Sequence, residues 1–266
     1  MPELGGPQMI EVTLNDRRLR VVGDRPRIAE FWRAAEAGRW EDETFRFLDA
    51  VTAESGAVLV DIGAWIGPVS LYAAPRVTRV IALEPDPVAH SELLANTSAN
   101  ASNVEVWNAA VDRNSGELKL YAPDGFGGSE TSSIGEGEAV TVRALTMAEI
   151  DAAVGQANRV ILKVDIEGHE YRILDDLIRF ARERKAAVHL SLHPRSYWND
   201  VRKTSGPLAA RRATFDATLS AIESLGTVGP VSLSSTGEPF SRGALFRRIF
   251  LKRRPKNFSV EVRSPA

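Results

Sequence analysis

The chain has 266 residues, of which 44% are hydrophobic and 26% are charged, a composition typical of a globular protein and long enough for one large domain. Its 33 basic and 35 acidic residues give a net charge of −2, so the overall charge does not indicate a specific nucleic-acid partner. The absence of cysteine excludes disulfides, thiolate nucleophiles and sulfur-ligated metal centres.

The N-terminal part predicts a cap built from a hairpin and two helices. Residues 9–22 alternate in polarity around Asn15-Asp16, which predicts a β-hairpin with a two-residue turn. Apolar residues at helical spacing predict helices over 26–37 and 41–53, whose aromatic residues either cover the core or contact an acceptor molecule. No signal pattern opens the chain and no apolar stretch approaches the roughly 18 residues of a membrane span, so we expect a cytoplasmic protein with no transmembrane segment.

The stretch V-L-V-D-I-G-A-W-I-G-P-V-S-L-Y, residues 58–72, predicts a strand, a tight glycine turn and a helix that begins at Pro68. In an open α/β sheet, a nucleotide-like ligand lies at this first turn, because glycines let the backbone approach it closely. A second apolar run, residues 80–83, ends in Glu84, where a carboxylate can accept hydrogen bonds from both hydroxyls of a ribose. The two strand ends predict one adenosine-sized site.

The remaining chain alternates strands and helices, which builds a parallel sheet through right-handed crossovers. We expect strands over 80–83, 104–107, 117–121, 139–145, 159–164, 188–192, 228–233 and 258–262, and helices over 87–100, 170–185 and 208–225. Thr146 and Glu149 form a capping box that opens a further short helix. The glycine- and serine-rich residues 123–137 form a long loop that either lines an acceptor site or lies on the surface as a flap. An exposed linker precedes the helix at 208.

Polar residues follow several of these strands, and the carboxyl ends of parallel strands share one edge of the sheet. They are Asp61, Glu84, Asn108, Asp112, Asp165, Glu167, His169, Glu170 and His193. The ligand is a dinucleotide or S-adenosylmethionine, since both present a ribose diol. The turn D-I-G-A-W-I-G lacks the G-x-G-x-x-G spacing that a pyrophosphate needs, and Asp61 would repel phosphate but could accept a hydrogen bond from a methionine amino group. These features favour S-adenosylmethionine.

Four segments together resemble the FkbM family of class I methyltransferases that use S-adenosylmethionine. They are V-D-I-G-A-W-I-G-P-V-S-L-Y, I-A-L-E-P-D-P, N-A-A-V-D-R-N-S-G-E-L-K-L and L-K-V-D-I-E-G-H-E. The sequence differs from the commoner family pattern at Trp65 and Pro68. The resemblance implies a class I, Rossmann-like α/β fold with a seven-stranded, mostly parallel sheet and helices on both faces. It also implies O-methylation, often of a sugar hydroxyl in a glycan, glycolipid or natural product.

The resemblance further implies the division of the chain and the cofactor positions. We expect an N-terminal hairpin and helical cap over 1–55 and a Rossmann-like domain over 56–266 that includes a basic C-terminal hairpin region. The cofactor would contact the glycine turn, the second strand end and residues near the adenine. These positions are Asp61, Gly63, Ala64, Gly67, Glu84, Pro85, Asn108, Ala110, Asp112 and Asp165.

Methyl transfer to a hydroxyl requires alignment of the acceptor oxygen and removal of its proton. The candidates for the general base are His169, Asp165 and His193, and the ordinary pKa of an imidazole near 6.5 suits His169 to that role. Alternatively, the same three residues hold a divalent metal ion against a sugar diol. Lys163 stands two residues before the strand end, so we expect it to lie within the sheet and pair with a carboxylate.

The stretch 242–256 contains seven basic residues and no acidic one, interleaved with apolar residues. It is either a solvated basic hairpin or helix packed on the domain, or a patch for an anionic surface, a phosphorylated or lipid-linked acceptor, or RNA.

Three alternatives to the sugar O-methyltransferase stay open. They are an RNA or protein methyltransferase, an oxidoreductase that binds nicotinamide adenine dinucleotide, and a binding protein without catalysis.

Overall fold

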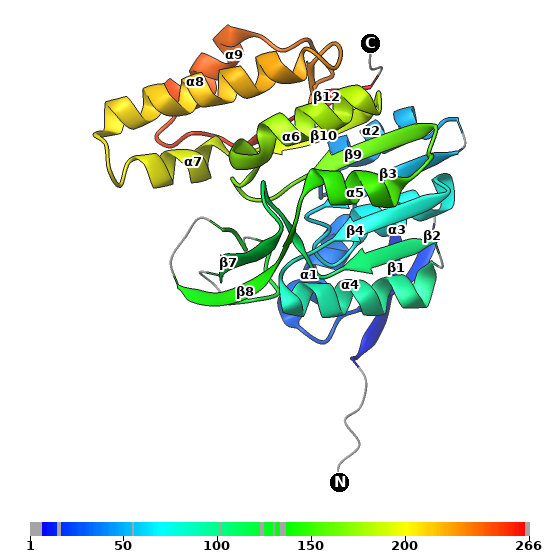
Figure 1. Ribbon diagram of the computed structural model, residues 1–266. Helices are drawn as coiled ribbons and strands as arrows, with labels where there is room; N and C mark the ends of the chain where they lie inside the picture. The colour runs from blue at the N-terminus through cyan, green and yellow to red at the C-terminus, as the bar shows by residue number, and fades with distance from the viewer. Residues whose placement is uncertain are drawn as a thin grey trace.

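A computed structural model describes residues 7–14, 17–54, 56–101, 103–122, 125–129, 131–133 and 137–263. Within these ranges the central feature is a seven-stranded sheet (Figure 1). Its strands, in spatial order, are β11 (Ser232–Leu233), β12 (Phe258–Val262), β10 (Ala187–Leu192), β9 (Arg159–Val164), β3 (Ala57–Ile62), β4 (Arg79–Leu83) and β5 (Val104–Trp107). Among these described strands, β12 runs antiparallel to both β10 and β11, and the remaining neighbouring pairs are parallel. The mostly parallel doubly wound sheet is confirmed.

Both faces of this sheet are buried, because alternate residues of each central strand point to opposite sides. In β3, Val58, Val60 and Ile62 pack in one core, and Ala57 and Leu59 pack in the other. The first core receives α5 (Met147–Val154), α6 (Glu170–Glu183) and α8 (Pro207–Leu225). The second receives α1 (Pro26–Glu36), α2 (Asp42–Val51), α3 (Pro68–Ala73) and α4 (Pro87–Asn100).

The N-terminal hairpin consists of β1 (Met9–Leu14) and β2 (Arg17–Val22), which pair antiparallel with Leu14 opposite Arg17. This register confirms the two-residue connection, although Asn15 and Asp16 themselves lie outside the described residues. The backbone N–H of Val22 donates to the Asn96 side chain on α4 at 2.7 Å. The hairpin is therefore attached to the helix that follows the second strand of the site.

A second, three-stranded sheet interrupts the alternation after β5. It contains β6 (Ala110–Val111), β8 (Glu138–Leu145) and β7 (Gly116–Ala122), in that order. The sequence predicts β7 and β8 but neither β6 nor the separate sheet. The predicted capping box of Thr146 and Glu149 is confirmed at the start of α5, the helix that follows β8.

Elsewhere in the chain, a 3₁₀ turn, η1 (Ala74–Arg76), follows α3.

Three C-terminal expectations are wrong in part. The segment expected as an exposed linker contains α7 (Pro194–Val201), which begins on a proline and buries Trp198 against the domain. The strand expected over 228–233 is reduced to β11, since Pro230 has no N–H to donate to a neighbouring strand. The basic stretch forms α9 (Arg242–Phe250) and not a hairpin. In the described part of the chain, every helix falls short of the length or apolar character that crossing a bilayer requires.

Candidate active site

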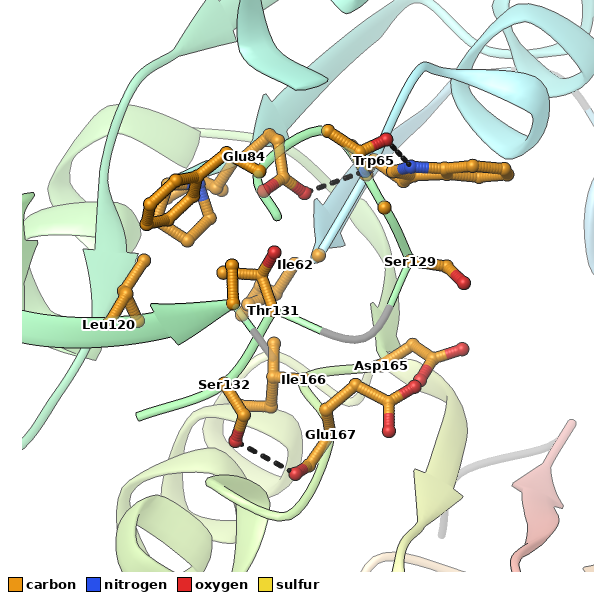
Figure 2. A pocket seen from close by; sticks show the side chains of 18 of the residues that line it. Ile62, Trp65, Glu84, Leu120, Ser129, Thr131, Ser132, Asp165, Ile166 and Glu167 are labelled. Carbon is orange, nitrogen blue, oxygen red and sulfur yellow. Dashed lines mark hydrogen bonds between the residues drawn. The ribbon is translucent and has the colours of Figure 1, made fainter. Parts of the chain in front are cut away.

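A cavity of about 720 Å³ lies at the carboxyl ends of β3, β4 and β9 (Figure 2). This volume is in the upper part of the range of small-molecule sites, roughly 300–1,000 Å³, so a cofactor and an acceptor can both fit. Glu84 stands at one end of the cavity, and Asp165 and Glu167 stand at the other (Figure 2). Phe31 of α1 and Trp40, which lies between α1 and α2, line the wall, and this places the predicted cap beside the site.

The glycine turn after β3 brings the backbone into direct contact with the neighbouring strand. Gly63 has a φ of +78°, and a Cβ atom at this position would lie 1.9 Å from the carbonyl oxygen of Asp165. Trp65 also lies in the left-handed region, with a φ of +50°. Its backbone N–H consequently points at Glu84 and donates to Oε2 at 2.8 Å. Only glycine fits at position 63, because any side chain would collide with the strand beside it.

Glu84 is a buried carboxylate with acceptor capacity left over. Its two oxygens accept from the N–H groups of Trp65 and Asp86, each at 2.8 Å. An ionised carboxylate offers about four lone-pair positions, so about two remain for a ligand. Burial raises the pKa of Glu84 to about 7, which the two backbone hydrogen bonds only partly offset. Asn108 supports the strand end from outside by donating to the carbonyl oxygen of Glu84 at 2.9 Å.

Asp61 is fully buried beneath the turn and does not line the cavity. It accepts the Ser70 hydroxyl at 2.6 Å and lies 3.2 Å from the Lys163 ammonium. Lys163 also donates to the carbonyl oxygen of Gly63 at 2.7 Å. Burial opposes the charged form of Lys163, but Asp61 and two further carboxylates outweigh it and raise its pKa. The predicted pairing of Lys163 is confirmed, and the pair supports the glycine turn from below.

The described part of the loop after β7, residues 125–129 and 131–133, lines one side of the cavity and is held by hydrogen bonds at Gly127. The Gly127 N–H donates to Asp86 at 2.6 Å, and its carbonyl oxygen accepts from Arg25 at 3.0 Å and from the Trp65 indole at 3.4 Å. Thr131 adds a second hydrogen bond to Asp86 at 2.8 Å. Several loop residues line the cavity, so the loop belongs to the site and is not a distant flap.

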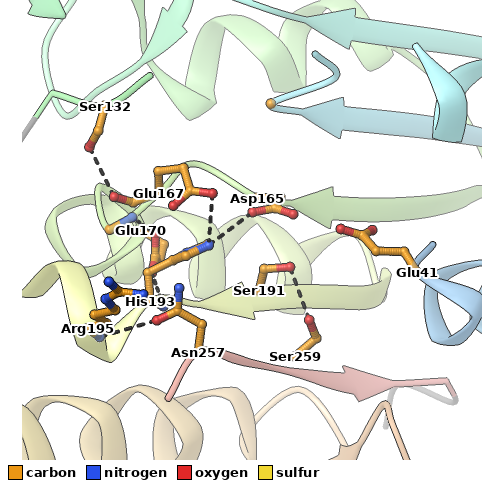
Figure 3. Close-up of polar contacts among 12 residues, drawn as sticks. Glu41, Ser132, Asp165, Glu167, Glu170, Ser191, His193, Arg195, Asn257 and Ser259 are labelled. Carbon is orange, nitrogen blue, oxygen red and sulfur yellow. Dashed lines mark hydrogen bonds and ion pairs between the residues drawn. The ribbon is translucent and has the colours of Figure 1, made fainter. Parts of the chain in front are cut away.

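Glu41 is the residue that sequence reasoning missed. It precedes α2 with a φ of +40° and lines the cavity. Burial, together with the negative charge of Asp165, raises the pKa of Glu41 to about 7. Figure 3 shows its carboxylate on the side of Asp165. A glutamate at the start of a helix has an ordinary capping explanation, so the sequence alone gave no sign of this position.

The two candidate histidines lie in different surroundings. His169 is buried with Nδ1 2.5 Å from the Ser133 hydroxyl and Nε2 3.3 Å from Asp112, and burial lowers its pKa despite that carboxylate. His193 lies with Nδ1 3.2 Å from Glu170 and Nε2 3.3 Å from Asp165 (Figure 3). Burial opposes the charge on His193, but the carboxylates around it outweigh burial and raise its pKa well above the ordinary value. In the described residues, the structure therefore does not group His169 with Asp165 and His193.

The structure divides the sequence-predicted residues into those that line the cavity and those that lie behind it. Lining it are Gly63, Ala64, Glu84, Pro85, Ala110, Asp165 and His169. Outside the lining are Asp61, Gly67, Asn108, Asp112 and His193. Gly67 begins α3 at a φ of +94°, so its part is to let the turn enter the helix.

The basic stretch lies apart from the cavity, and none of its residues lines the wall. Leu245 and Ile249 of α9 are fully buried, in a core shared with α8. Arg211 of α8 donates to the backbone carbonyls of Lys252 and Arg253, which follow α9. Packing on the domain thus accounts for Leu245 and Ile249, whereas Phe246 and Leu251 are exposed.

A family model and a curated relative both indicate a methyltransferase. The family model described as a methyltransferase FkbM domain matches residues 61–204. A curated relative, the hexuronic acid methyltransferase AglP of Haloferax volcanii, is 25% identical over 147 residues, which are 55% of this chain and 60% of the relative. The matched region thus spans less than two thirds of that relative.

Solved structures with lower identity were also found. The methyltransferase FkbM of Methylobacillus flagellatus is 18% identical with a TM-score of 0.44, and the match covers 78% of this chain and 44% of the other. A precorrin-6y C5,15-methyltransferase of Geobacter metallireducens is 18% identical with a TM-score of 0.34, covering 64% of this chain and 68% of the other. Both TM-scores are below 0.5.

Proposed function

The chain belongs to the FkbM methyltransferase family, and on this premise we propose that it transfers the methyl group of S-adenosylmethionine to a hydroxyl of a sugar-containing acceptor. The observation that carries the proposal is the arrangement of one cavity with a buried carboxylate, Glu84, at one end and a pair of carboxylates, Glu41 and Asp165, at the other.

The residues at the Glu84 end fit the adenosine part of the cofactor. Glu84 keeps lone pairs for both ribose hydroxyls after accepting from two backbone N–H groups. The Gly63 turn presents bare backbone to the cavity, because the Asp165 carbonyl already fills the place of a Cβ atom, and Ala64 adds little bulk. The Trp65 indole is hydrogen-bonded to the Gly127 carbonyl, so it closes the wall at the place where a pyrophosphate would need backbone N–H groups.

The Asp165 end fits an acceptor hydroxyl. S-adenosylmethionine supplies an electrophilic methyl group, which leaves with no electrons while the C–S bonding pair stays on sulfur. Glu41 receives the hydroxyl proton in our proposal, because its carboxylate lines the cavity and lies close enough to Asp165 to interact with its charge. His169 is less suited to receive it, because burial lowers its pKa and its Nδ1 already lies 2.5 Å from the Ser133 hydroxyl. We propose that His169 positions Ser133 and the loop around it through the hydrogen bond between its Nδ1 and the Ser133 hydroxyl.

A sugar acceptor is the class that the relative suggests, since AglP is named for hexuronic acid. Arg27 lines the cavity and would complement an acidic sugar, while Phe31, Trp40 and Trp65 supply apolar wall. The basic stretch does not contribute to this wall. An RNA or protein substrate that depended on it would have to reach the cavity from a distant surface.

Thermal-shift titration tests the cofactor. S-adenosylhomocysteine, but not a nicotinamide dinucleotide, should raise the melting temperature of the protein, by linkage of binding to folding. A shift with the dinucleotide alone would favour an oxidoreductase. No shift with either ligand would favour a binding protein without catalysis.

Transfer of a labelled methyl group tests the acceptor, with hexuronic acid glycosides and matched neutral hexosides offered side by side. Glu41→Gln should lower kcat by about 10²–10⁴-fold with unchanged affinity for S-adenosylhomocysteine. A Glu41→Gln variant with full turnover would remove this residue from the reaction. Label on RNA or protein and not on glycosides would refute the sugar assignment.

A further inference from the structure

Three donor atoms from two strand ends converge at the acceptor end of the cavity. His193 Nε2 lies 3.3 Å from Asp165 Oδ1 and 3.5 Å from Glu167 Oε1, and the ligand atoms of all three residues lie within 4.8 Å of one another (Figure 3). Donor atoms about 2.1 Å from one ion lie about 3.0 Å apart at octahedral angles and about 3.4 Å apart at tetrahedral angles. The distances from His193 Nε2 to the two carboxylate oxygens are therefore close to those between ligand atoms that share one ion.

The His193 ring is oriented by Glu170, which lies on the side of the ring opposite the two carboxylates. Its side chain is more than nine-tenths buried, and Nδ1 lies 3.2 Å from Oε1 of Glu170, which is itself fully buried. The same Glu170 oxygen accepts the His193 backbone N–H at 2.7 Å, and the other accepts Gly168 N–H at 2.8 Å. A carboxylate that accepts from one ring nitrogen and directs the other toward an ion is the usual support of a metal-bound histidine. This support does not depend on the charges in front of the ring.

The surroundings supply negative charge and access. Asp165 and Glu167 line the cavity, and Glu41 adds a third carboxylate on the same side. Lys163 neutralises only part of this charge, because its ammonium is committed to Asp61 and to the Gly63 carbonyl. A cation could thus enter the cluster through the cavity, and the negative charge of the carboxylates would attract it.

We propose that Asp165, Glu167 and His193 bind a divalent cation at the acceptor end of the cavity. Two carboxylates and one imidazole suit Mn²⁺, Mg²⁺ or Zn²⁺, and three protein ligands leave coordination positions free for two neighbouring hydroxyls of an acceptor. The cation lowers the pKa of a coordinated hydroxyl and fixes its orientation. This inference rests on the proposed function, and it replaces His169 of the predicted ligand set with Glu167.

Titration of Mn²⁺ into chelator-treated protein, followed by the paramagnetic resonance signal of free Mn²⁺, tests the site without any turnover. We expect one saturable site, weakened at least tenfold by Glu167→Gln and by His193→Gln. Asp112→Asn is the matched control, because Asp112 lies 3.3 Å from His169 in a similar pair outside the cluster. It should retain the affinity of the unaltered protein.

Two results overturn the proposal. They are the absence of saturable Mn²⁺ binding, and equal affinity in a Glu167→Gln variant that melts like the unaltered protein. Either would leave the cluster as an ion-pair network around a protonated His193. Calorimetry with S-adenosylhomocysteine on the same chelated samples separates this failure from that of the proposed function. Cofactor binding without Mn²⁺ binding refutes the cation site alone, and Mn²⁺ binding without cofactor binding refutes the function.

Discussion

We expect the Glu84 carboxylate to make the affinity for the cofactor depend on pH near neutrality. Its pKa is raised to about 7 by burial, so about one molecule in ten carries the ionised form at pH 6 and about nine in ten carry it at pH 8. Only the ionised form offers acceptors to both ribose hydroxyls. Apparent affinity scales with the competent fraction, so the affinity for S-adenosylhomocysteine should rise about tenfold from pH 6 to pH 8.

Titration calorimetry at a series of pH values between 6 and 8 measures this dependence. Glu84→Gln should bind more weakly at every pH and lose the dependence, because its amide does not titrate. Glu41→Gln is the matched control: the pKa of Glu41 is also about 7, but this carboxylate stands at the acceptor end, so the dependence should persist. Constant affinity across the range in the unaltered protein, or an unchanged slope in Glu84→Gln, would refute the assignment of Glu84 to the ribose.

Two further predictions concern the support of the turn. Lys163→Met leaves the Asp61 charge buried and unpaired, and should lower the free energy of unfolding by about 3–5 kcal/mol in urea denaturation. Stability equal to the unaltered protein would contradict the pairing. Gly63→Ala places a Cβ atom 1.9 Å from the Asp165 carbonyl and should reduce S-adenosylhomocysteine affinity more than tenfold, whereas Gly38→Ala, with nothing within 4 Å, should not. Equal affinity in both variants would show that the turn tolerates a side chain.

The fold around the first turn could be predicted because local and long-range signals agree there. The nearly continuous apolar run in residues 58–62 fits a strand buried on both faces, and the structure places its two sets of side chains in separate cores. Glu84 follows from its position at the end of the next parallel strand. Lys163 follows from the same logic, since a charge inside a buried strand needs a partner.

The details of the acceptor end could not be predicted, because they depend on backbone turns and on packing between distant segments. Glu167 and Gly168 have φ values of +52° and +106°, and this double turn separates His169 from His193. Glu41 reaches the cavity only through the packing of the N-terminal helices on the sheet, which no strand-end rule describes. The helix α7 was missed because its two buried residues are the proline that begins it, Pro194, and Trp198, which stands among polar residues.

A crystal structure with S-adenosylhomocysteine tests the central claim most directly. The account predicts ribose hydroxyls within hydrogen-bonding distance of Glu84 and the sulfur atom directed toward Glu41 and Asp165. A ribose bound elsewhere in the cavity, or a sulfur atom directed away from these two carboxylates, would contradict it.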